Sequence, residues 1–150
     1  MEVELSDILA VILAAILGGV IGVEREFRRK AAGLRTNVLI CVGAAVFTII
    51  SRKMGGTGEQ SVTRIAAQIV TGVGFLGAGA IVRDRGGVLG LTTAATIWLV
   101  ASIGMACGAG FFKLAAVTTV LAILVLIGLS KLERAIKNWG PKKQPDNNPQ

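Results

Sequence analysis

The charged residues of this chain are placed so that they separate five long apolar stretches. Asp, Glu, Lys and Arg make up only 17% of the sequence. A helix that spans the hydrocarbon core of a bilayer needs about 20 mostly apolar residues, with about 17 as the lower limit. The pattern therefore predicts an all-α integral membrane protein with five transmembrane helices, which we expect at residues 5–23, 34–51, 65–82, 91–109 and 113–130.

The composition excludes several classes of protein. Hydrophobic residues are 53% of the chain and the mean hydropathy is +0.69, more apolar surface than a soluble domain of this size can bury. Histidine is absent, which removes His-based metal sites and the usual Ser-His-Asp and Cys-His catalytic systems. The phosphate-binding pattern G-x-x-x-x-G-K-[ST] is absent too, which excludes a self-contained ATP-driven pump. We expect no enzyme, no cofactor, no metal and no nucleic-acid partner.

Positive charge is divided unequally between the two sides of the membrane. Twelve of the 16 Lys and Arg residues follow the first, third and fifth expected helices. Because basic residues favour the cytoplasmic side, we expect the N-terminus outside, the C-terminus inside, and anionic lipid at the basic cytoplasmic rim. We expect the transmembrane domain to cover residues 1–133. The proline-containing tail, 134–150, is predicted to be cytoplasmic and disordered.

Glycine is abundant inside the expected helices. The run G-V-G-F-L-G at residues 72–77 matches the dinucleotide-binding pattern. That mechanism needs a preceding strand and an acid about 20 residues later, whereas this run is in a charge-free helix and no acid follows Asp84 until Glu133. We interpret such residues as sites where helices approach closely in lipid. The expected packing glycines are Gly18, Gly22, Gly72, Gly74, Gly77, Gly79, Gly104 and Gly108.

Polar residues near the helix ends are the candidate functional groups. Arg64 and Gln68 are four residues apart and share a helix face, which would face protein or water unless Arg64 snorkels outward. The cytoplasmic joints hold three acids and seven basic residues, so we expect the acids to pair with arginine rather than to bind Mg²⁺. The acids near the N-terminus and Glu59 could gather cations only loosely.

The two halves of the chain resemble each other. E-R-E followed by G-L-R-T in the first half corresponds to R-D-R followed by G-L-T-T in the second. This pattern predicts two similar hairpins plus a fifth helix, as in repeat-built transporters. We expect Cys41 and Cys107 at different depths, as small packing residues rather than a redox or metal pair.

Several motifs occur in one order along the chain. They are G-V-E-R-E (22–26), A-G-L-R-T (32–36), R-I-A-A-Q-I-V-T-G-V-G-F-L-G-A-G (64–79), G-L-T-T-A-A-T-I-W (90–98) and A-C-G-A-G (106–110). Together they closely resemble the MgtC/SapB family of bacterial inner-membrane proteins.

The resemblance implies a five-helix domain in the bacterial inner membrane, with a part in Mg²⁺ homeostasis and in adaptation to low Mg²⁺. Some members contribute to the intracellular survival of pathogens. Two features depart from the family. Ser61 stands where an acid is common, and longer members add a soluble cytoplasmic domain, so we expect a short form. The family's characteristic polar positions correspond to Glu24, Arg25, Arg35, Thr36, Asn37, Arg64, Gln68, Thr92, Thr93 and Cys107.

Two hypotheses of function follow from these observations. In the first, the chain is a regulatory protein that acts through contacts with lipid, with other membrane proteins or with further copies of itself. In the second, it transports Mg²⁺ or another small ion along a path lined by Arg64, Gln68, Asn37 and the threonine pairs. The glycine-rich faces and the basic rim favour the first.

Overall fold

The chain folds into five helices and a short β-hairpin within the residues that the computed structural model describes, 2–54, 59–84 and 87–139. The side chains of residues 59–65, 131 and 133–139 lie outside this description. The elements are α1 (Leu5–Phe27), α2 (Leu34–Met54), α3 (Glu59–Gly79), β1 (Val82–Asp84), β2 (Gly87–Leu89), α4 (Leu91–Gly108) and α5 (Phe112–Trp139).

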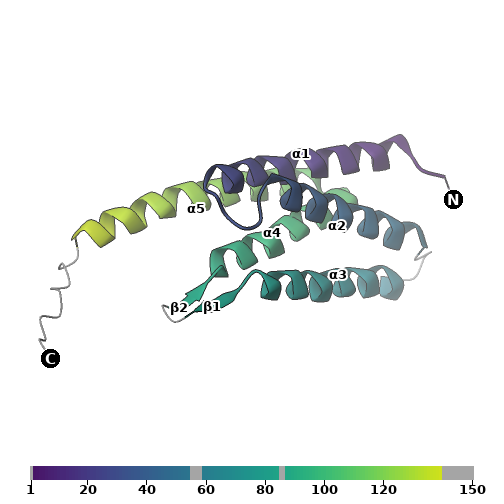
Figure 1. The fold of residues 1–150 in the computed structure, drawn as a ribbon. Coiled ribbons are helices and arrows are strands. Elements are labelled where there is room, and N and C mark those ends of the chain that lie inside the picture. Colours follow the sequence, from purple (N-terminus) through teal and green to yellow (C-terminus); the bar gives the residue numbers. More distant parts are fainter. Residues whose placement is uncertain (1, 55–58, 85–86, 140–150) are drawn as a thin grey trace, which may run out of the picture.

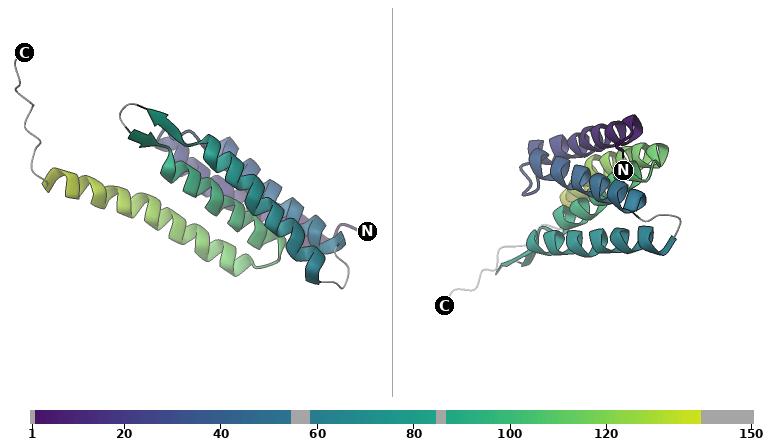
Figure 2. Two further views of the ribbon diagram at one scale, coloured as in Figure 1. Left: turned by 90° about the horizontal axis from the view of Figure 1, so that it is seen from below. Right: turned by 90° about the vertical axis from the view of Figure 1, so that its right-hand side faces the viewer.

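Helices α1, α2 and α4 form the centre of the bundle. Helix α3 packs on α2 and α4, and α5 packs on α1 and α4 (Figures 1 and 2). The central core is built from small and β-branched side chains, because these let the helices lie close together. Its fully buried members include Ala14, Ile21, Cys41, Val100 and Ile103.

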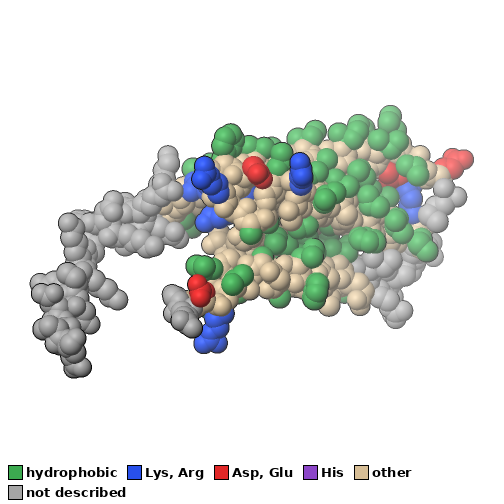
Figure 3. Space-filling view, viewed as in Figure 1, with side chains coloured by type: hydrophobic (Ala, Val, Ile, Leu, Met, Phe, Trp, Pro, Cys, Tyr) green, Lys and Arg blue, Asp and Glu red, His purple; other side chains and the backbone are tan. Residues whose placement is uncertain are grey.

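The outer surface is apolar over most of the helix lengths. Four helices, α1, α2, α4 and residues 112–130 of α5, are long and apolar enough to cross a bilayer, and α3 contributes a shorter apolar segment, Ala66–Gly79. On the face shown in Figure 3, the charged side chains gather toward the two ends of the helices. Large apolar side chains such as Phe47 and Leu124 point outward, 58% and 61% exposed. A surface of this kind is in contact with lipid.

The third helix and the connection that follows it differ from the prediction. Helix α3 starts before residue 65 and ends at Gly79 rather than at residue 82, and Val82 begins an antiparallel hairpin in which it pairs with Leu89. Gly90, with φ +90°, then leads into α4. A Cβ at this position would overlap the carbonyl oxygen of Ala80, so the turn requires glycine.

The first, second and fifth helices are longer than predicted. Helix α1 continues through Glu24–Arg25–Glu26 to Phe27, because these charges are paired as described below, and α2 continues to Met54. Helix α5 runs to Trp139, well past Ser130, so residues 134–139 are helical and not part of a disordered tail. The rest of the predicted tail, 140–150, lies outside the described residues.

Four of the eight predicted packing glycines lie where helices meet closely. A Cβ at Gly18 would be 2.7 Å from the Cβ of Cys41, and one at Gly22 would be 2.8 Å from the Cα of Leu34. On α4, a Cβ at Gly104 would overlap the carbonyl oxygen of Cys41, and one at Gly108 would be 2.8 Å from the Cβ of Thr48. These contacts fix α2 against α1 and α4.

The glycines of α3 behave differently from the prediction. A Cβ at Gly72, Gly74 or Gly79 would meet nothing within 4 Å, so within the described part of the chain these three glycines do not pack helices together. Gly77 is in ordinary contact with Ala94 of α4, at 3.6 Å from its carbonyl oxygen. Most small residues of α3 are therefore exposed, on more than one side of the helix.

Candidate functional site

The bundle has two polar ends, which we name by what they contain. The hairpin end holds the α1–α2 loop and the β1–β2 hairpin. The N-terminal end holds the start of α1 and the end of α2 (Figure 1).

At the hairpin end, a buried charge cluster closes α1. The guanidinium of Arg25 is 2% exposed, and its Nε donates to Glu24 Oε2 at 2.6 Å. Arg28, one helical turn beyond Glu24, forms an ion pair with the same carboxylate and donates a hydrogen bond to the hydroxyl of Ser130 on α5. Glu24 is thus held by two arginines, as expected from the excess of positive charge.

The loop between α1 and α2 is held from both sides. The N–H of Lys30 donates to the carbonyl of Arg25 at 3.0 Å and Arg29 has φ +53°, which is a Schellman ending of α1. Glu26 then accepts the N–H of Leu34 at 3.0 Å, at the start of α2. The second acid of the E-R-E motif is exposed, and its carboxylate caps the N-terminus of α2.

Asn37 fastens the same loop from inside. Its side chain is fully buried and its Nδ2 donates to the carbonyls of Ala32 and Gly33, each at 2.8 Å. Its Oδ1, like Nη1 of Arg25, is buried without a hydrogen-bond partner among the described residues. Arg25 Nη1 can still donate a hydrogen bond and Asn37 Oδ1 can still accept one. Two buried polar atoms at this end therefore have unused hydrogen-bonding capacity.

The other candidate residues are not gathered into one site. Thr93 and Cys107 are buried at opposite ends of α4, while Arg35, Thr36 and Thr92 are exposed at the hairpin end. Gln68 is exposed on α3, and Arg64 has its side chain outside the described residues. The structure brings together Glu24, Arg25 and Asn37 near the α1–α2 loop, but not with Gln68 or Cys107.

The two cysteines lie in the central core of the bundle. Cys41 of α2 and Cys107 of α4 are both fully buried thiols in one core cluster. Helices α2 and α4 cross closely, with Gly104 next to Cys41 and Gly108 next to Ala45 and Thr48. Their role as small core residues agrees with this packing.

A groove opens between α2 and α3. It has a volume of about 510 Å³ and is lined by Leu39, Ile40, Gly43, Ala44, Phe47, Gln68, Ile69, Gly72, Val73 and Leu76. Among these residues only Gln68 has a polar side chain. A Cβ at Gly43 or Gly72 would meet nothing within 4 Å. Because neither residue has a side chain, the groove is deeper at these two positions. Asn37, in contrast, lies on the side of α2 that faces α1, next to Gly22.

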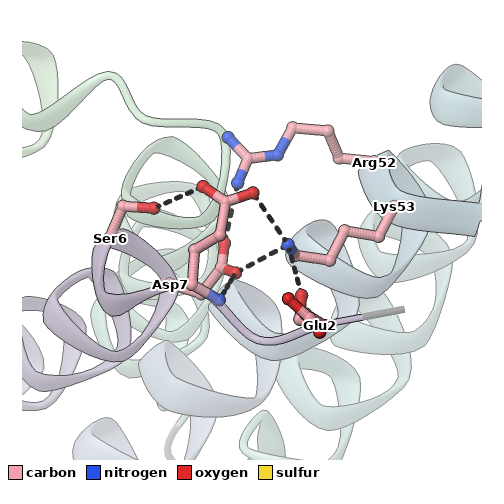
Figure 4. A network of polar contacts seen from close by, with 6 residues as sticks. Glu2, Ser6, Asp7, Arg52 and Lys53 are labelled. Atoms are coloured by element: carbon pink, nitrogen blue, oxygen red, sulfur yellow. Dashed lines mark hydrogen bonds and ion pairs between the residues drawn. The ribbon is translucent and has the colours of Figure 1, made fainter.

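The N-terminal end holds an ion-pair network that sequence reasoning missed (Figure 4). The side chain of Asp7 is 3% exposed and forms two ion pairs. Its Oδ1 lies 2.9 Å from Nη2 of Arg52, and its Oδ2 lies 2.9 Å from Nζ of Lys53. It also accepts the N–H of Glu4 at 3.0 Å, and Lys53 lies 3.4 Å from the carboxylate of Glu4. The sequence did contain a signal for this network. Asp7 lies at the start of one helix and Arg52 and Lys53 lie at the end of the next, which is antiparallel to it.

This network pairs two of the N-terminal acids that could have gathered cations loosely. Asp7 and Glu4 are bound to lysine and arginine, and Glu59 lies outside the residues with described side chains. No group of three or more Cys, Asp or Glu residues that could hold a metal ion occurs in the part of the chain that was described.

The helices, their apolar exterior and the paired charges at both ends define a multi-pass helical membrane protein. The sequence pattern of the MgtC family matches residues 11–135, and the chain belongs to this family. The recognition made from the motifs is thereby confirmed.

Two relatives illustrate how far the similarity extends. Protein MgtC of Brucella abortus (strain 2308) is 54% identical over 112 residues, which cover 75% of this chain and 46% of that protein. Protein MgtC of Salmonella typhimurium (strain LT2) is 48% identical over 129 residues, which cover 86% of this chain and 54% of that protein. The chain spans about half the length of the curated relatives it matches. No solved structure matches it.

Proposed function

We propose that this chain is a regulatory protein of the bacterial inner membrane, which acts in Mg²⁺ homeostasis and in adaptation to low Mg²⁺. It acts through contacts with other membrane proteins and with lipid. Membership of the MgtC family supports the magnesium role. The α2–α3 groove supports the proposed contact with other membrane proteins, and it is the observation that carries this part of the proposal.

The groove suits a transmembrane helix of another membrane protein. Its floor is formed by Gly43, Ala44 and Gly72, and small residues let a second backbone come close. Gln68 offers an amide at the same surface, and an amide hydrogen-bonds well across a helix interface in lipid. Gly72, the open glycine of α3 that lines the groove, thus faces a partner instead of the chain's own helices.

The paired acids argue for regulation rather than for a resident cation site. Mg²⁺ needs oxygen ligands that are not already neutralised. Glu24 is bound to Arg25 and Arg28, and Asp7 is bound to Arg52 and Lys53. These two carboxylates therefore stabilise helix ends, one at each end of the bundle.

The proposal includes an orientation in the membrane. All five helices, with α3 included, cross the bilayer, the N-terminal end faces outward, and the hairpin end faces the cytoplasm. The distribution of Lys and Arg supports this orientation. The pairs α1–α2 and α3–α4 are the two hairpins of a parallel repeat, although a capped loop joins the first pair and a β-hairpin joins the second.

A growth experiment tests the role of the groove. In a bacterium that lacks its own MgtC-family gene, the wild-type chain is expected to restore growth in low-Mg²⁺ medium. Gly72→Leu should abolish the rescue, because leucine fills the groove where a Cβ meets open space. Gly128→Leu is the matched control, since this glycine is equally open but lies on α5 outside the groove. Normal rescue by Gly72→Leu, at equal membrane levels, would contradict the proposal.

The alternative function is transport of Mg²⁺ or another small ion past Gln68. The observation in its favour is that this exposed amide opens onto the groove. Mg²⁺ entry into sealed liposomes that contain the purified chain, measured with a trapped Mg²⁺ dye, distinguishes transport from the regulatory role. We expect entry no faster than into empty liposomes. Entry above that level, lost in Gln68→Leu, would establish a transporter and overturn the regulatory proposal.

A further inference from the structure

A second groove lies between α1 and α5, at the hairpin end. It has a volume of about 420 Å³. Its wall is apolar, and Glu24 and Arg28 stand beside it where α1 ends. Val20, Val23 and Phe27 are 46%, 42% and 86% exposed, so the wall is open to the surrounding lipid. The apolar residues that line it are Val20, Val23, Phe27, Ile123 and Ile127.

Arg28 is the residue that distinguishes this groove from the rest of the lipid-facing surface. It is the C-cap residue of α1, at the level where the apolar helix surface ends. Its Nε faces Glu24 and its Nη1 binds Ser130, which joins α1 to α5 across the groove. Its Nη2 has no hydrogen bond with the described side chains, and its side chain is 24% exposed. Donors of the guanidinium therefore remain for an anion.

The charge around Arg28 is positive. Residues 24–30 contain four basic and two acidic side chains. Glu24 is already shared between two arginines and Glu26 is bound to the N–H of Leu34. Neither acid is free to neutralise the outward side of Arg28, so an anion at this point meets a net positive field.

We infer that this groove is a binding site for an anionic phospholipid. One acyl chain lies along the wall formed by Val23, Phe27 and Ile127, and the headgroup phosphate binds Arg28. The apolar wall lies inside the bilayer and the guanidinium lies at its edge. An anionic phospholipid has the same order, with its acyl chains inside and its phosphate at the edge. A protein helix would need an acidic side chain at this one depth, whereas the anionic lipids of a membrane all present a phosphate there.

This inference deepens the lipid contact in the proposed function and rests on it. A diffuse basic rim attracts anionic lipid to many positions at once and is strongly screened by salt. The site proposed here has one position, next to Arg28, and needs both the charge and the apolar wall. The diffuse rim and the single site can therefore be distinguished by variants that remove the same charge at different positions.

The test is the dissociation constant of the first bound lipid, measured by native mass spectrometry of the purified full chain at high salt. Phosphatidylglycerol is expected to bind more tightly than phosphatidylcholine. Arg28→Gln should weaken phosphatidylglycerol binding about tenfold, as expected for the loss of a charged hydrogen bond. Lys30→Gln removes the same charge from an exposed loop residue outside the groove, and it should leave the binding nearly unchanged.

A second pair of variants tests the apolar wall in case Arg28→Gln does not fold. Val23→Phe should weaken binding by filling the groove, while Leu121→Phe, at an exposed position of α5 that does not line it, should not. Equal losses in Arg28→Gln and Lys30→Gln would overturn the site and leave only a diffuse rim. Equal affinity of the wild type for both lipids, or full affinity in Val23→Phe, would also overturn it.

Discussion

Helix α2 packs differently on its two sides. Toward α1 and α4 it meets glycines, and a Cβ at Gly18 or Gly104 would collide with Cys41. Toward α3, Ile69 and Val73 pack in a buried cluster with Ala44. The glycines on both helices, Gly43 and Gly72, nevertheless face empty space, and a groove of about 510 Å³ opens there. The same residue type thus builds a closed contact on one side and an open one on the other.

This difference separates stability from function. Closed contacts put backbone against backbone, so they contribute van der Waals packing that added side-chain atoms would destroy. An open contact contributes little to the stability of the chain itself, and it leaves room for a partner. The side of α2 that faces α1 and α4 is therefore the structural side, and the side that faces α3 is the one where we place the function.

The largest expected effect of a single substitution is at Gly104. Gly104→Leu forces side-chain atoms into the carbonyl of Cys41 and the Cβ of Ala44, in a contact between two helix backbones. We expect a loss of about 3 kcal/mol in the free energy of unfolding, or failure to fold, because backbone atoms cannot move aside. Thermal unfolding in detergent, followed by circular dichroism, measures it against Gly128→Leu. An unchanged midpoint would show that the α2–α4 contact is not closed.

An intermediate effect is expected at Asn37, on the same side of α2. Asn37→Ala removes two hydrogen bonds, to the carbonyls of Ala32 and Gly33, and leaves those groups without this buried donor. We expect a loss of about 1–2 kcal/mol. Faster hydrogen exchange in the α1–α2 loop should accompany it. Thr36→Ala, at the exposed neighbouring residue, is the control. Equal stability of the two variants would remove Asn37 from the structural side.

The existence of the five helices could be predicted because the charges that separate them are unambiguous. The end of α3 could not, since Ile81 and Val82 continue the apolar run, while the close approach of Gly90 to the Ala80 carbonyl is a tertiary contact. The strands β1 and β2 are also too short to show an alternating pattern of their own.

The candidate site shows the same division between local and tertiary signals. The pairing of Glu24 with Arg28 follows from their four-residue spacing on one helix. The contact of Arg28 with Ser130, and that of Asp7 with Arg52 and Lys53, join helices that only the fold brings together. For the glycines, the sequence contains no sign of which are closed and which are open, because both kinds occur inside apolar helices with small neighbours.

The smallest expected effect is at Gly74, on an exposed face of α3 outside the groove. Gly74 is the central glycine of the G-V-G-F-L-G run, yet a Cβ there meets nothing within 4 Å among the described residues. Gly74→Leu should change the free energy of unfolding by less than about 0.5 kcal/mol, as surface substitutions do. The same thermal unfolding assay measures it, with Gly104→Leu as the contrasting variant. A loss as large as that of Gly104→Leu would mean that this exposed face of α3 is closed against other parts of the chain.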